Sequence, residues 1–544
     1  MVLLSNDFCY IMYIQEERMG IMGVYLNPGA AMLLRARASE IYVDKSNILK
    51  LLNRVCNTQE NYVCISRPRR FGKSMTANLI SAYYDRTVET IKVFAGLNYA
   101  KSTEFARWAG KFDVIKVNVQ EFLSNSESIA ELLTLWQQSL LWDLLAEYPD
   151  YRYFNKNNLA RTMSDIYVYT GRTFVIVIDE WDCIFREYKD DKAAQRVYLD
   201  FLRDWLKDKP YISLAYMTGI LPIKKYGTHS ALNMFAEYSM VEPGPMAEFT
   251  GFTSSEVENL CQQYDMSMEE TKSWYDGYHF AKAGDIYNPR SVVESMYRHN
   301  YANYWNQTET FEALKIYIDM NYEGLKDAII TMMAGDKIKI DVRSFTNDMT
   351  TFHNADDIMT LLVHLGYLGY DASSQQVFIP NREILSEFVT ATSVSKWTEI
   401  IKSVQQSDEL LTATWHLDEQ RVAEGIARAH LDTSQLQYND ENALSYTVSL
   451  AYYSARQYYQ LYRELPAGRG FADIIYVPRV KYVDKPAMII ELKWNKSAET
   501  AITKIKAKKY PLALQGYTEK ILLVGINYDR KTKKHECLIE WFDE

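Results

Sequence analysis

The residues Arg67–Ser74 have the order that a phosphate-binding loop requires. Their sequence, RPRRFGKS, follows a short apolar run and opens a helical pattern, and in such a loop the backbone N–H groups and the helix N-terminus hold phosphate oxygens. Lys73 is then expected to reach the β- and γ-phosphates, and Ser74 to ligate Mg²⁺. Arg67 stands where the usual pattern has its first glycine, and its Cβ restricts the backbone there. Taken alone, the tripeptide GKS is explained equally well by an ordinary loop and helix start.

A strand end with two carboxylates supports the nucleotide interpretation. The run Phe174–Ile178 is apolar and mostly β-branched, and Asp179 and Glu180 follow it directly. The first carboxylate of such a pair lies next to Mg²⁺ and the second near the attacking water, although a strand that simply ends in an acidic turn is the alternative. Thr218 ends the next apolar run, where a polar side chain would sense the γ-phosphate. The predicted nucleotide contacts are Arg69, Arg70, Phe71, Gly72, Lys73, Ser74 and Thr218.

A second set of charges interrupts apolar runs near the C-terminus. Asp473 lies in FADIIY, and Glu491 and Lys493 lie in IIELK. Alternate side chains of a strand share a face, so Glu491 and Lys493 point to the same side. Two carboxylates on neighbouring strands can hold one or two Mg²⁺ ions, and the lysine can orient the water that attacks a phosphodiester. Because charges within apolar strands are costly unless they bind something, these three residues are predicted to be catalytic, with the two carboxylates as metal ligands.

The charge of the C-terminal region differs from that of the whole chain. Between residues 479 and 534, fourteen Arg and Lys accompany five Asp and Glu, whereas the whole chain has a net charge of −10. A local basic region in an acidic protein favours a polyanionic ligand, and we expect nucleic acid, in particular DNA, as the partner. The alternative is a solvated strand edge beside a solvated basic helix.

The elements that must position these residues alternate in the N-terminal half. Predicted strands lie at 62–66, 112–119, 174–178 and 212–218, with helical patterns at 73–85 and 129–145 between them. This alternation predicts a parallel sheet with helices on its faces.

The rest of the chain reads as mostly helical until its last hundred residues. Helical patterns cover 252–299, beginning at Thr253 or Ser254 with Glu256 nearby, and continue through 300–345. Residues 356–389 predict a helix and a β-hairpin, as in a small winged-helix-like unit, or else a simple connector. Strands are predicted at 471–477, 487–494 and 520–526, with a basic helix at 500–510.

Length and composition set the broad class. With 544 residues and 48% hydrophobic residues, the chain can build several globular cores. Its six scattered cysteines form no CxxC pair, which fits a reducing cytoplasm and argues against a zinc ribbon. No apolar run approaches the roughly 18 residues that span a membrane. The first 21 residues make a poor signal peptide and are predicted to be an extension upstream of a native start at Met19 or Met22.

These segments together resemble a known architecture. The stretches SEIYVDKS at 39–46, RPRRFGKS, Asp179-Glu180, Thr218-Gly219, WYDGY at 274–278 and YNP at 287–289 resemble the bacterial AAA-ATPase-like family. Gly468-Arg469, Asp473, ELK at 491–493 and Tyr510 look like its usual C-terminal partner, a PD-(D/E)xK nuclease-superfamily domain. Gly366-Tyr367-Leu368 and Ile379-Pro380-Asn381 are similar to the central region of that architecture.

The resemblance implies roles for the motif residues and also shows two departures. It implies nucleotide binding by Lys73 and Ser74, Mg²⁺ and water handling by Asp179 and Glu180, and nuclease-type metal binding by Asp473 and Glu491 with Lys493. Many members of the nuclease superfamily carry a glutamine on the helix after the ExK strand, where this chain offers Lys504. Ala472 replaces the proline of the superfamily's name.

We therefore expect an α/β protein with four parts. These are an N-terminal extension (1–21), a P-loop NTPase domain with a parallel sheet and a helical lid (22–300), a helical and winged-helix-like connector (301–429) and an α/β restriction-endonuclease-like domain (430–544). The predicted function is ATP hydrolysis coupled to a Mg²⁺-dependent nuclease. The protein is expected in the cytoplasm without a membrane partner, and it can form homo-oligomers. Two alternatives remain: an ATP-dependent switch whose nuclease-like domain binds without cleaving, and a nucleotide-stabilised scaffold.

Overall fold

The computed structural model describes residues 23–542 apart from gaps at 224, 227–228, 231, 282, 306–310, 321, 323, 334, 347–348, 395–406, 433–440, 453, 468–469, 480–481 and 515–519. The predicted extension and the Gly468-Arg469 motif lie outside the described residues. The chain forms two compact units, one of Met1–Thr308 with Lys339–Leu385 and one of Glu309–Ile338 with Ser386–Glu544.

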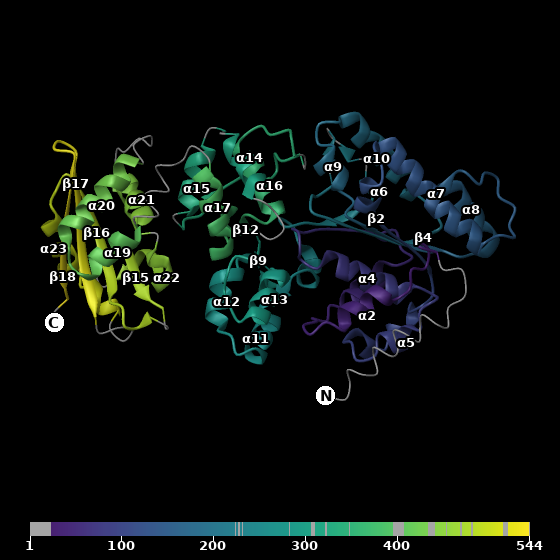
Figure 1. Ribbon diagram of the computed structural model, residues 1–544, viewed down its shortest axis with the longest axis horizontal. Helices are drawn as coiled ribbons and strands as arrows, with labels where there is room; N and C mark the ends of the chain where they lie inside the picture. The colour runs from purple at the N-terminus through teal and green to yellow at the C-terminus, as the bar shows by residue number, and fades with distance from the viewer. Residues whose placement is uncertain are drawn as a thin grey trace. The chain divides into compact units, whose positions relative to one another are not determined.

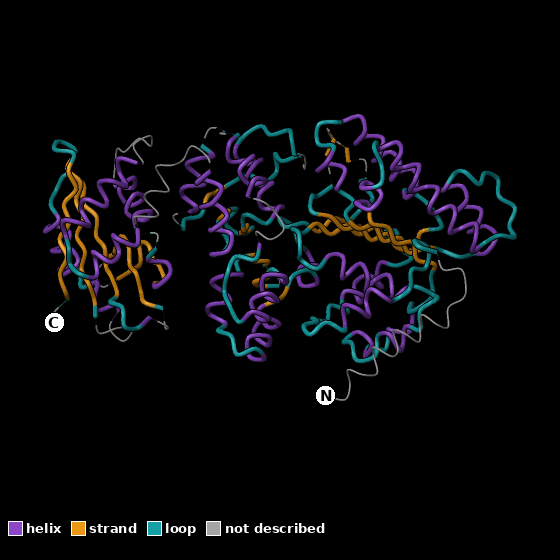
Figure 2. The backbone as a smooth tube through the Cα atoms, in the orientation of Figure 1, coloured by secondary structure: helices purple, strands orange, loops and turns teal. Residues whose placement is uncertain are grey.

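A parallel five-stranded sheet forms the centre of the first unit, as the alternation of strands and helices predicts. Its order is β2-β3-β4-β1-β7, from β1 Tyr62–Ser66, β2 Asp113–Asn118, β3 Phe174–Asp179, β4 Ile212–Gly219 and β7 Ala236–Tyr238. Every residue of β1, β3 and β4 is buried, because helices cover both faces of the sheet, as Figure 1 and Figure 2 show. Strand β7, only three residues long, has no run that would reveal it in the sequence.

The helices around this sheet begin where polar side chains can cap them. Ser128 accepts a hydrogen bond from Glu131 N at the start of α7, and Asn158 accepts one from Arg161 N at the start of α8. The bounds are α2 Ala31–Arg37, α3 Ile48–Val55, α4 Lys73–Tyr84, α5 Thr90–Val93, α6 Val119–Ser124, α7 Ile129–Glu147, α8 Leu159–Thr170, α9 Cys183–Glu187 and α10 Lys192–Leu206. A short hairpin, β5 Lys225–Tyr226 and β6 His229–Ser230, follows β4.

The lid, residues 252–298, combines three helices with a small antiparallel sheet. Thr253 and Glu256 form a complete capping box at the start of α11, which confirms the predicted helix start. The helices are α11 Ser254–Gln263, α12 Met268–Tyr275 and α13 Pro289–Arg298, and the sheet has the order β8-β10-β9 from β8 Phe252–Thr253, β10 Gly284–Tyr287 and β9 Tyr278–Phe280. The sequence predicts helix throughout this region, since strands of two to four residues are too short to show alternation.

The winged-helix-like segment of the first unit is built on α16 Ala355–Leu365. Asn354 caps this helix, and left-handed Gly366 ends it before the hairpin of β12 Gly369–Asp371 and β13 Gln376–Phe378. A Cβ on Gly366 would lie 2.8 Å from the Pro68 side chain, so the turn after α16 packs directly on the phosphate loop. The elements β11 Ile338–Lys339 and α17 Arg382–Val394 flank this segment in the sequence.

The second unit contains a mixed sheet between two helical layers. Its order is β14-β15-β16-β17-β18, antiparallel except for the parallel pair β16–β17, from β14 Tyr459–Ala467, β15 Gly470–Pro478, β16 Ala487–Trp494, β17 Ile521–Asp529 and β18 Lys534–Trp541. Helix α23 Ala498–Ala507 is the crossover from β16 to β17. The other helices are α14 Phe311–Asp319, α15 Leu325–Met333, α19 Ser407–Trp415, α20 Glu419–Asp432, α21 Glu441–Ala451 and α22 Ala455–Tyr458.

Alternation along β16 decides which residues face α23. Ile489 packs in a core with Ile502 and Ile505 of α23, whereas Met488 and Ile490 pack in the core on the opposite face with α19, α20 and α21. Glu491 and Lys493 continue the alternation of Ile489 and so belong to the α23 side of the sheet.

Candidate functional site

The phosphate loop connects buried strand β1 to α4, which begins at Lys73. Gly72 has φ 84° and Arg70 has φ 64°, so two residues near its end take the left-handed conformation. No atom lies within 4 Å of a Cβ built on Gly72, which means that conformation rather than space favours glycine there. Left-handed residues before a helix N-terminus are part of the backbone arrangement that binds anions.

Lys73 is held inside the loop that precedes it. Its Nζ donates hydrogen bonds to the carbonyl oxygens of Pro68 at 2.9 Å and Arg67 at 3.1 Å, and the side chain is buried. Burial lowers the pKa of Lys73, and the opposing influence comes from the carboxylates of Glu180 and Asp179. A buried ammonium between a phosphate loop and two carboxylates suits a ligand that carries both phosphate and a divalent cation.

Asp179 ends β3 beside the first turn of α4. The Ser74 hydroxyl donates a hydrogen bond to its carboxylate, which brings together the two predicted Mg²⁺ ligands. Burial raises the pKa of Asp179, whereas the Ser74 hydrogen bond and the Lys73 charge lower it. A hydroxyl and a carboxylate side by side are oxygen donors of the kind that Mg²⁺ prefers, so these residues fit the ion.

Glu180 leaves the strand through a left-handed backbone with φ 55°. Its Oε2 accepts a hydrogen bond from Arg186 Nη2 at 2.6 Å, and Arg186 Nε lies 3.4 Å from Asp182 Oδ2. Burial raises the pKa of Glu180, and the charge of Lys73 opposes that shift. The amino-acid sequence alone does not identify Arg186 as a partner of Glu180. The only signal in the sequence is a basic residue six positions after Glu180, which lies within the short helix α9.

Thr218 lies between the phosphate loop strand and the carboxylate strand. Strand β4 separates β1 from β3, and Thr218 is in register with Ile65 on one side and Asp179 on the other. Its Oγ1 is buried and has no hydrogen-bond partner among the residues that the structure describes. An orphaned hydroxyl at this strand end fits a polar group that the site would bind.

Replacing Thr218 with valine is expected to separate stability from activity. Valine has nearly the same shape and removes the unsatisfied hydroxyl, so the free energy of unfolding should rise by about 1 kcal/mol. ATP turnover should fall about tenfold or more if the hydroxyl donates to the phosphate. Urea denaturation and a phosphate-release assay measure the two quantities, and unchanged turnover would remove Thr218 from the site.

A cavity of about 840 Å³ opens over the phosphate loop, a volume within the range of ligand pockets. The predicted residues Arg69–Ser74 and Glu180 line it, whereas Asp179 and Thr218 do not. The site residues predicted from the sequence do not include its apolar walls, which are formed by Ile41, Tyr42, Val43, Phe249, Phe252, Val293 and Tyr297. Two basic side chains outside the phosphate loop, Lys45 and Arg290, also line the cavity. The cavity therefore joins a cationic, phosphate-type end to an apolar part that fits a nucleotide base.

Arg67, at the position of the usual first glycine, does not line this cavity. It is fully buried, its Nη1 donates to Tyr238 O at 3.0 Å, and its guanidinium lies 5.1 Å from the Phe280 ring centroid. Burial lowers the pKa of Arg67 to about 10. The loop accommodates a long side chain at this position because the Arg67 guanidinium lies against Tyr238 of β7 and Phe280 of β9, outside the cavity.

The three predicted C-terminal residues come together on β15 and β16. Asp473 Oδ2 accepts a hydrogen bond from Leu492 N at 2.7 Å. Lys493 Nζ donates to Glu491 Oε1 at 2.6 Å and to Leu492 O at 2.7 Å. Burial raises the pKa of Glu491, and hydrogen bonds from Lys493 and Lys504 oppose that shift.

Helix α23 brings Lys504 to the same cluster. Lys504 Nζ donates to Glu491 Oε1, and a hydrogen bond between Lys504 and buried Tyr510 joins that ring to the cluster. A Cβ on Gly525 would lie 2.4 Å from Ala498 O, so glycine in β17 allows α23 to pack this closely. Only tertiary packing reveals the contact, since the two partners lie thirteen positions apart in the sequence.

The cluster fits a divalent cation with few protein ligands. Glu491 Oε2 is buried and has no hydrogen-bond partner among the described residues, which leaves one carboxylate oxygen for a cation. Within the described ranges, no group of three or more His, Cys, Asp and Glu could hold a metal. Asp473 and Glu491 would therefore be its side-chain ligands, with oxygen donors that suit Mg²⁺.

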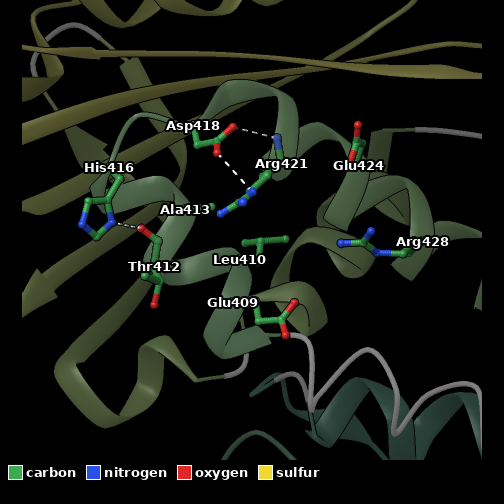
Figure 3. Close-up of a pocket in the computed structure, with 9 residues that line it drawn as sticks. All are labelled: Glu409, Leu410, Thr412, Ala413, His416, Asp418, Arg421, Glu424 and Arg428. Atoms are coloured by element: carbon green, nitrogen blue, oxygen red, sulfur yellow. Dashed lines mark hydrogen bonds and ion pairs between the residues drawn. The ribbon is translucent and has the colours of Figure 1, made fainter.

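A separate hollow of about 660 Å³ lies between α19 and α20 of the second unit. Figure 3 shows its charged side chains spread around the rim, with Arg421 Nε 3.4 Å from Asp418 Oδ2 and His416 Nδ1 2.7 Å from Thr412 O. None of the predicted site residues lines it.

In the part of the chain that the structure describes, no helix has the length and apolar character to cross a bilayer.

Comparison with protein families finds two matches in this chain. Residues 34–228 match the family described as predicted AAA-ATPase, and residues 440–537 match the PD-(D/E)XK nuclease superfamily. The first match includes the phosphate loop, the carboxylate pair and Thr218, and the second includes Asp473, Glu491, Lys493 and Lys504.

Individual relatives are distant. An uncharacterized protein in the vnfD 5′ region of Azotobacter chroococcum mcd 1 is 22% identical over 281 residues, which cover 49% of this chain and 51% of that protein. The chain thus spans about half the length of this curated relative. The ORC2 protein of Aeropyrum pernix in ADPNP–ADP complexes aligns over 68% of this chain and 99% of its own, with 13% identity and a TM-score of 0.30. The ORC1 protein of Aeropyrum pernix with DNA aligns over 69% and 98%, with 11% identity and a TM-score of 0.24.

Proposed function

Because this chain combines an AAA-ATPase-like domain with a PD-(D/E)XK nuclease-superfamily domain, we propose that it is an ATP-controlled, Mg²⁺-dependent nuclease. ATP binding and hydrolysis in the first domain would gate cleavage of nucleic acid, expected to be DNA, in the second. The observation that carries this proposal is the presence of two separate clusters in which a buried lysine faces a pair of carboxylates.

In the ATPase domain, each residue near the phosphate loop has a distinct task. Lys73 balances the charge of the β- and γ-phosphates, while Glu180 accepts the proton of the attacking water and Arg186 orients its carboxylate. Mg²⁺ bound by Ser74 and Asp179 would neutralise further phosphate charge. Thr218 Oγ1 donates to the γ-phosphate, a role supported by its lack of any other partner among the described residues.

In the nuclease domain, Lys493 orients and helps to deprotonate the attacking water, and Asp473 and Glu491 bind the metal. A divalent cation at these carboxylates would stabilise the charge that develops on phosphorus. Exposed basic residues would hold the polyanionic backbone. They lie directly after α23 and at the tip of the β17–β18 hairpin: Lys508, Lys509, Arg530, Lys531, Lys533 and Lys534.

A second function is favoured by one specific contact. Lys504 shares Glu491 Oε1 with Lys493, so two ammonium groups occupy one oxygen of a metal ligand. In this alternative, the nuclease-like domain binds nucleic acid or a protein partner in response to ATP and does not cleave. The chain would then act as a regulatory switch.

The two functions are separated by nuclease assays on the full chain with and without ATP. Wild type, Lys73→Ala and Lys493→Ala are incubated with plasmid, single-stranded DNA and RNA in Mg²⁺ or Mn²⁺. We expect ATP-dependent nicking by wild type, no product from Lys493→Ala, and loss of the ATP response in Lys73→Ala. Absence of product from wild type on every substrate, identical to an Asp473→Ala control, would contradict the nuclease and favour the switch.

Cellular context and assembly belong to the same proposal. We place the protein in the cytoplasm because Cys56, Cys64, Cys183, Cys261 and Cys537 are all free thiols. The domain boundaries at residues 300 and 429 remain predictions. The formation of homo-oligomers is also a prediction.

A further inference from the structure

The two oxygens of the Glu491 carboxylate have unequal partners. Oε1 accepts hydrogen bonds from both Lys493 and Lys504, whereas Oε2 is buried without a partner among the described residues. Two ammonium groups on one oxygen repel each other, and their shared carboxylate is what holds them together. Two lysine ammonium groups of the chain thus occupy one oxygen of Glu491, and the other oxygen is left for a further cation.

The two lysines differ in how deeply their side chains are buried. Lys493 is a strand neighbour of Glu491, its side chain is 8% exposed, and its Nζ also donates to Leu492 O. Lys504 reaches Glu491 from α23, is also hydrogen-bonded to Tyr510, and has a side chain that is 35% exposed. Lys493 is therefore enclosed in the site, whereas part of the Lys504 side chain is in contact with solvent.

Charge balance connects Lys504 to metal binding. Asp473 and Glu491 bring two negative charges, and Lys493 and Lys504 bring two positive charges, so the cluster is neutral without any further ion. A divalent cation on Glu491 would stand beside the Lys504 ammonium, and like charges at such separations oppose each other strongly in a buried site. Metal and Lys504 thus compete for one carboxylate.

We propose that Lys504 is a displaceable cationic latch on the metal site, which gives up Glu491 when a divalent cation binds and turns toward solvent or the phosphodiester. This inference rests on the proposed metal-dependent function and names its regulation. The latch would hold metal affinity low until a polyanion supplies negative charge for both cations. Lys504 acts through Glu491 and is a positioning residue.

Metal affinity tests the latch without relying on cleavage. Mn²⁺ is titrated by calorimetry into the full chain without nucleotide, and binding that disappears in Glu491→Ala defines the C-terminal site. We expect Lys504→Gln to bind Mn²⁺ at this site about tenfold more tightly than wild type. Lys504→Arg, which keeps the charge, should behave like wild type. The matched control is Lys506→Gln. Lys506 also lies on α23, but it pairs with Glu540 and not with Glu491. This variant loses the same charge and should bind Mn²⁺ as tightly as wild type.

Two results would overturn the latch, and they differ in what else they overturn. If Lys504→Gln and wild type bind Mn²⁺ equally at the Glu491-dependent site, or the variant binds more weakly, the latch is wrong and the metal site stands. If neither protein shows Glu491-dependent binding, the proposed metal site fails together with the latch. Thermal melting of each variant confirms that the compared chains are folded.

Discussion

Replacing Glu180 with glutamine should lower ATP turnover by a factor of about a hundred or more while ATP binding persists. Glutamine keeps the size of the side chain but cannot accept the proton of the attacking water, and general-base catalysis contributes roughly 10²–10⁴-fold. Arg186 then loses one of its two carboxylate partners and keeps Asp182. Turnover is measured by phosphate release, and binding by titration with a fluorescent ATP analogue.

Glu187→Gln is the matched control for this experiment. Glu187 is the last residue of α9 and is exposed. Its substitution removes the same charge seven residues from Glu180, so ATP turnover should stay at the wild-type level. Wild-type turnover in Glu180→Gln would show that another group accepts the proton. A loss of ATP binding in Glu180→Gln would show instead that the side chain holds the nucleotide.

Replacing Glu491 with glutamine is expected to abolish nucleic-acid cleavage, with a loss of about a hundredfold or more, and to leave ATP turnover unchanged. Glutamine keeps the volume of the buried side chain and can still accept hydrogen bonds from Lys493, but it is a poor metal ligand. Loss of its charge leaves two ammonium groups near one neutral amide, so the second unit should also become less stable. Plasmid nicking and phosphate release are measured on the same preparation.

The control for this variant is Glu499→Gln, an exposed residue in the first turn of α23. It should nick plasmid like wild type. Nicking by Glu491→Gln at the wild-type rate, with a melting temperature that shows a folded chain, would exclude Glu491 as a metal ligand. Loss of ATP turnover in this variant would show that the two activities cannot be separated.

The amino-acid sequence by itself determines the elements that carry the chemistry. Buried strands β1, β3 and β4 appear as apolar runs, and the polar residues that end them, such as Asp179 and Thr218, stand out for that reason. Glu491 and Lys493 are equally visible, because charges inside an apolar strand are rare and their alternation assigns them to one face. Strands β7, β14 and β18 and the lid sheet escape detection, because they are short or lack an apolar run.

Only the tertiary structure decides which of these residues share a site. The strand order places β4 between β1 and β3, and thereby Thr218 beside Asp179. Close packing at Gly525 lets Lys504 reach Glu491, and the fold brings Tyr42 and Tyr297 to the same cavity. Periodicity is a property of consecutive residues and can be read along the chain. Contacts between distant residues depend on how helices and strands pack, which no local pattern encodes.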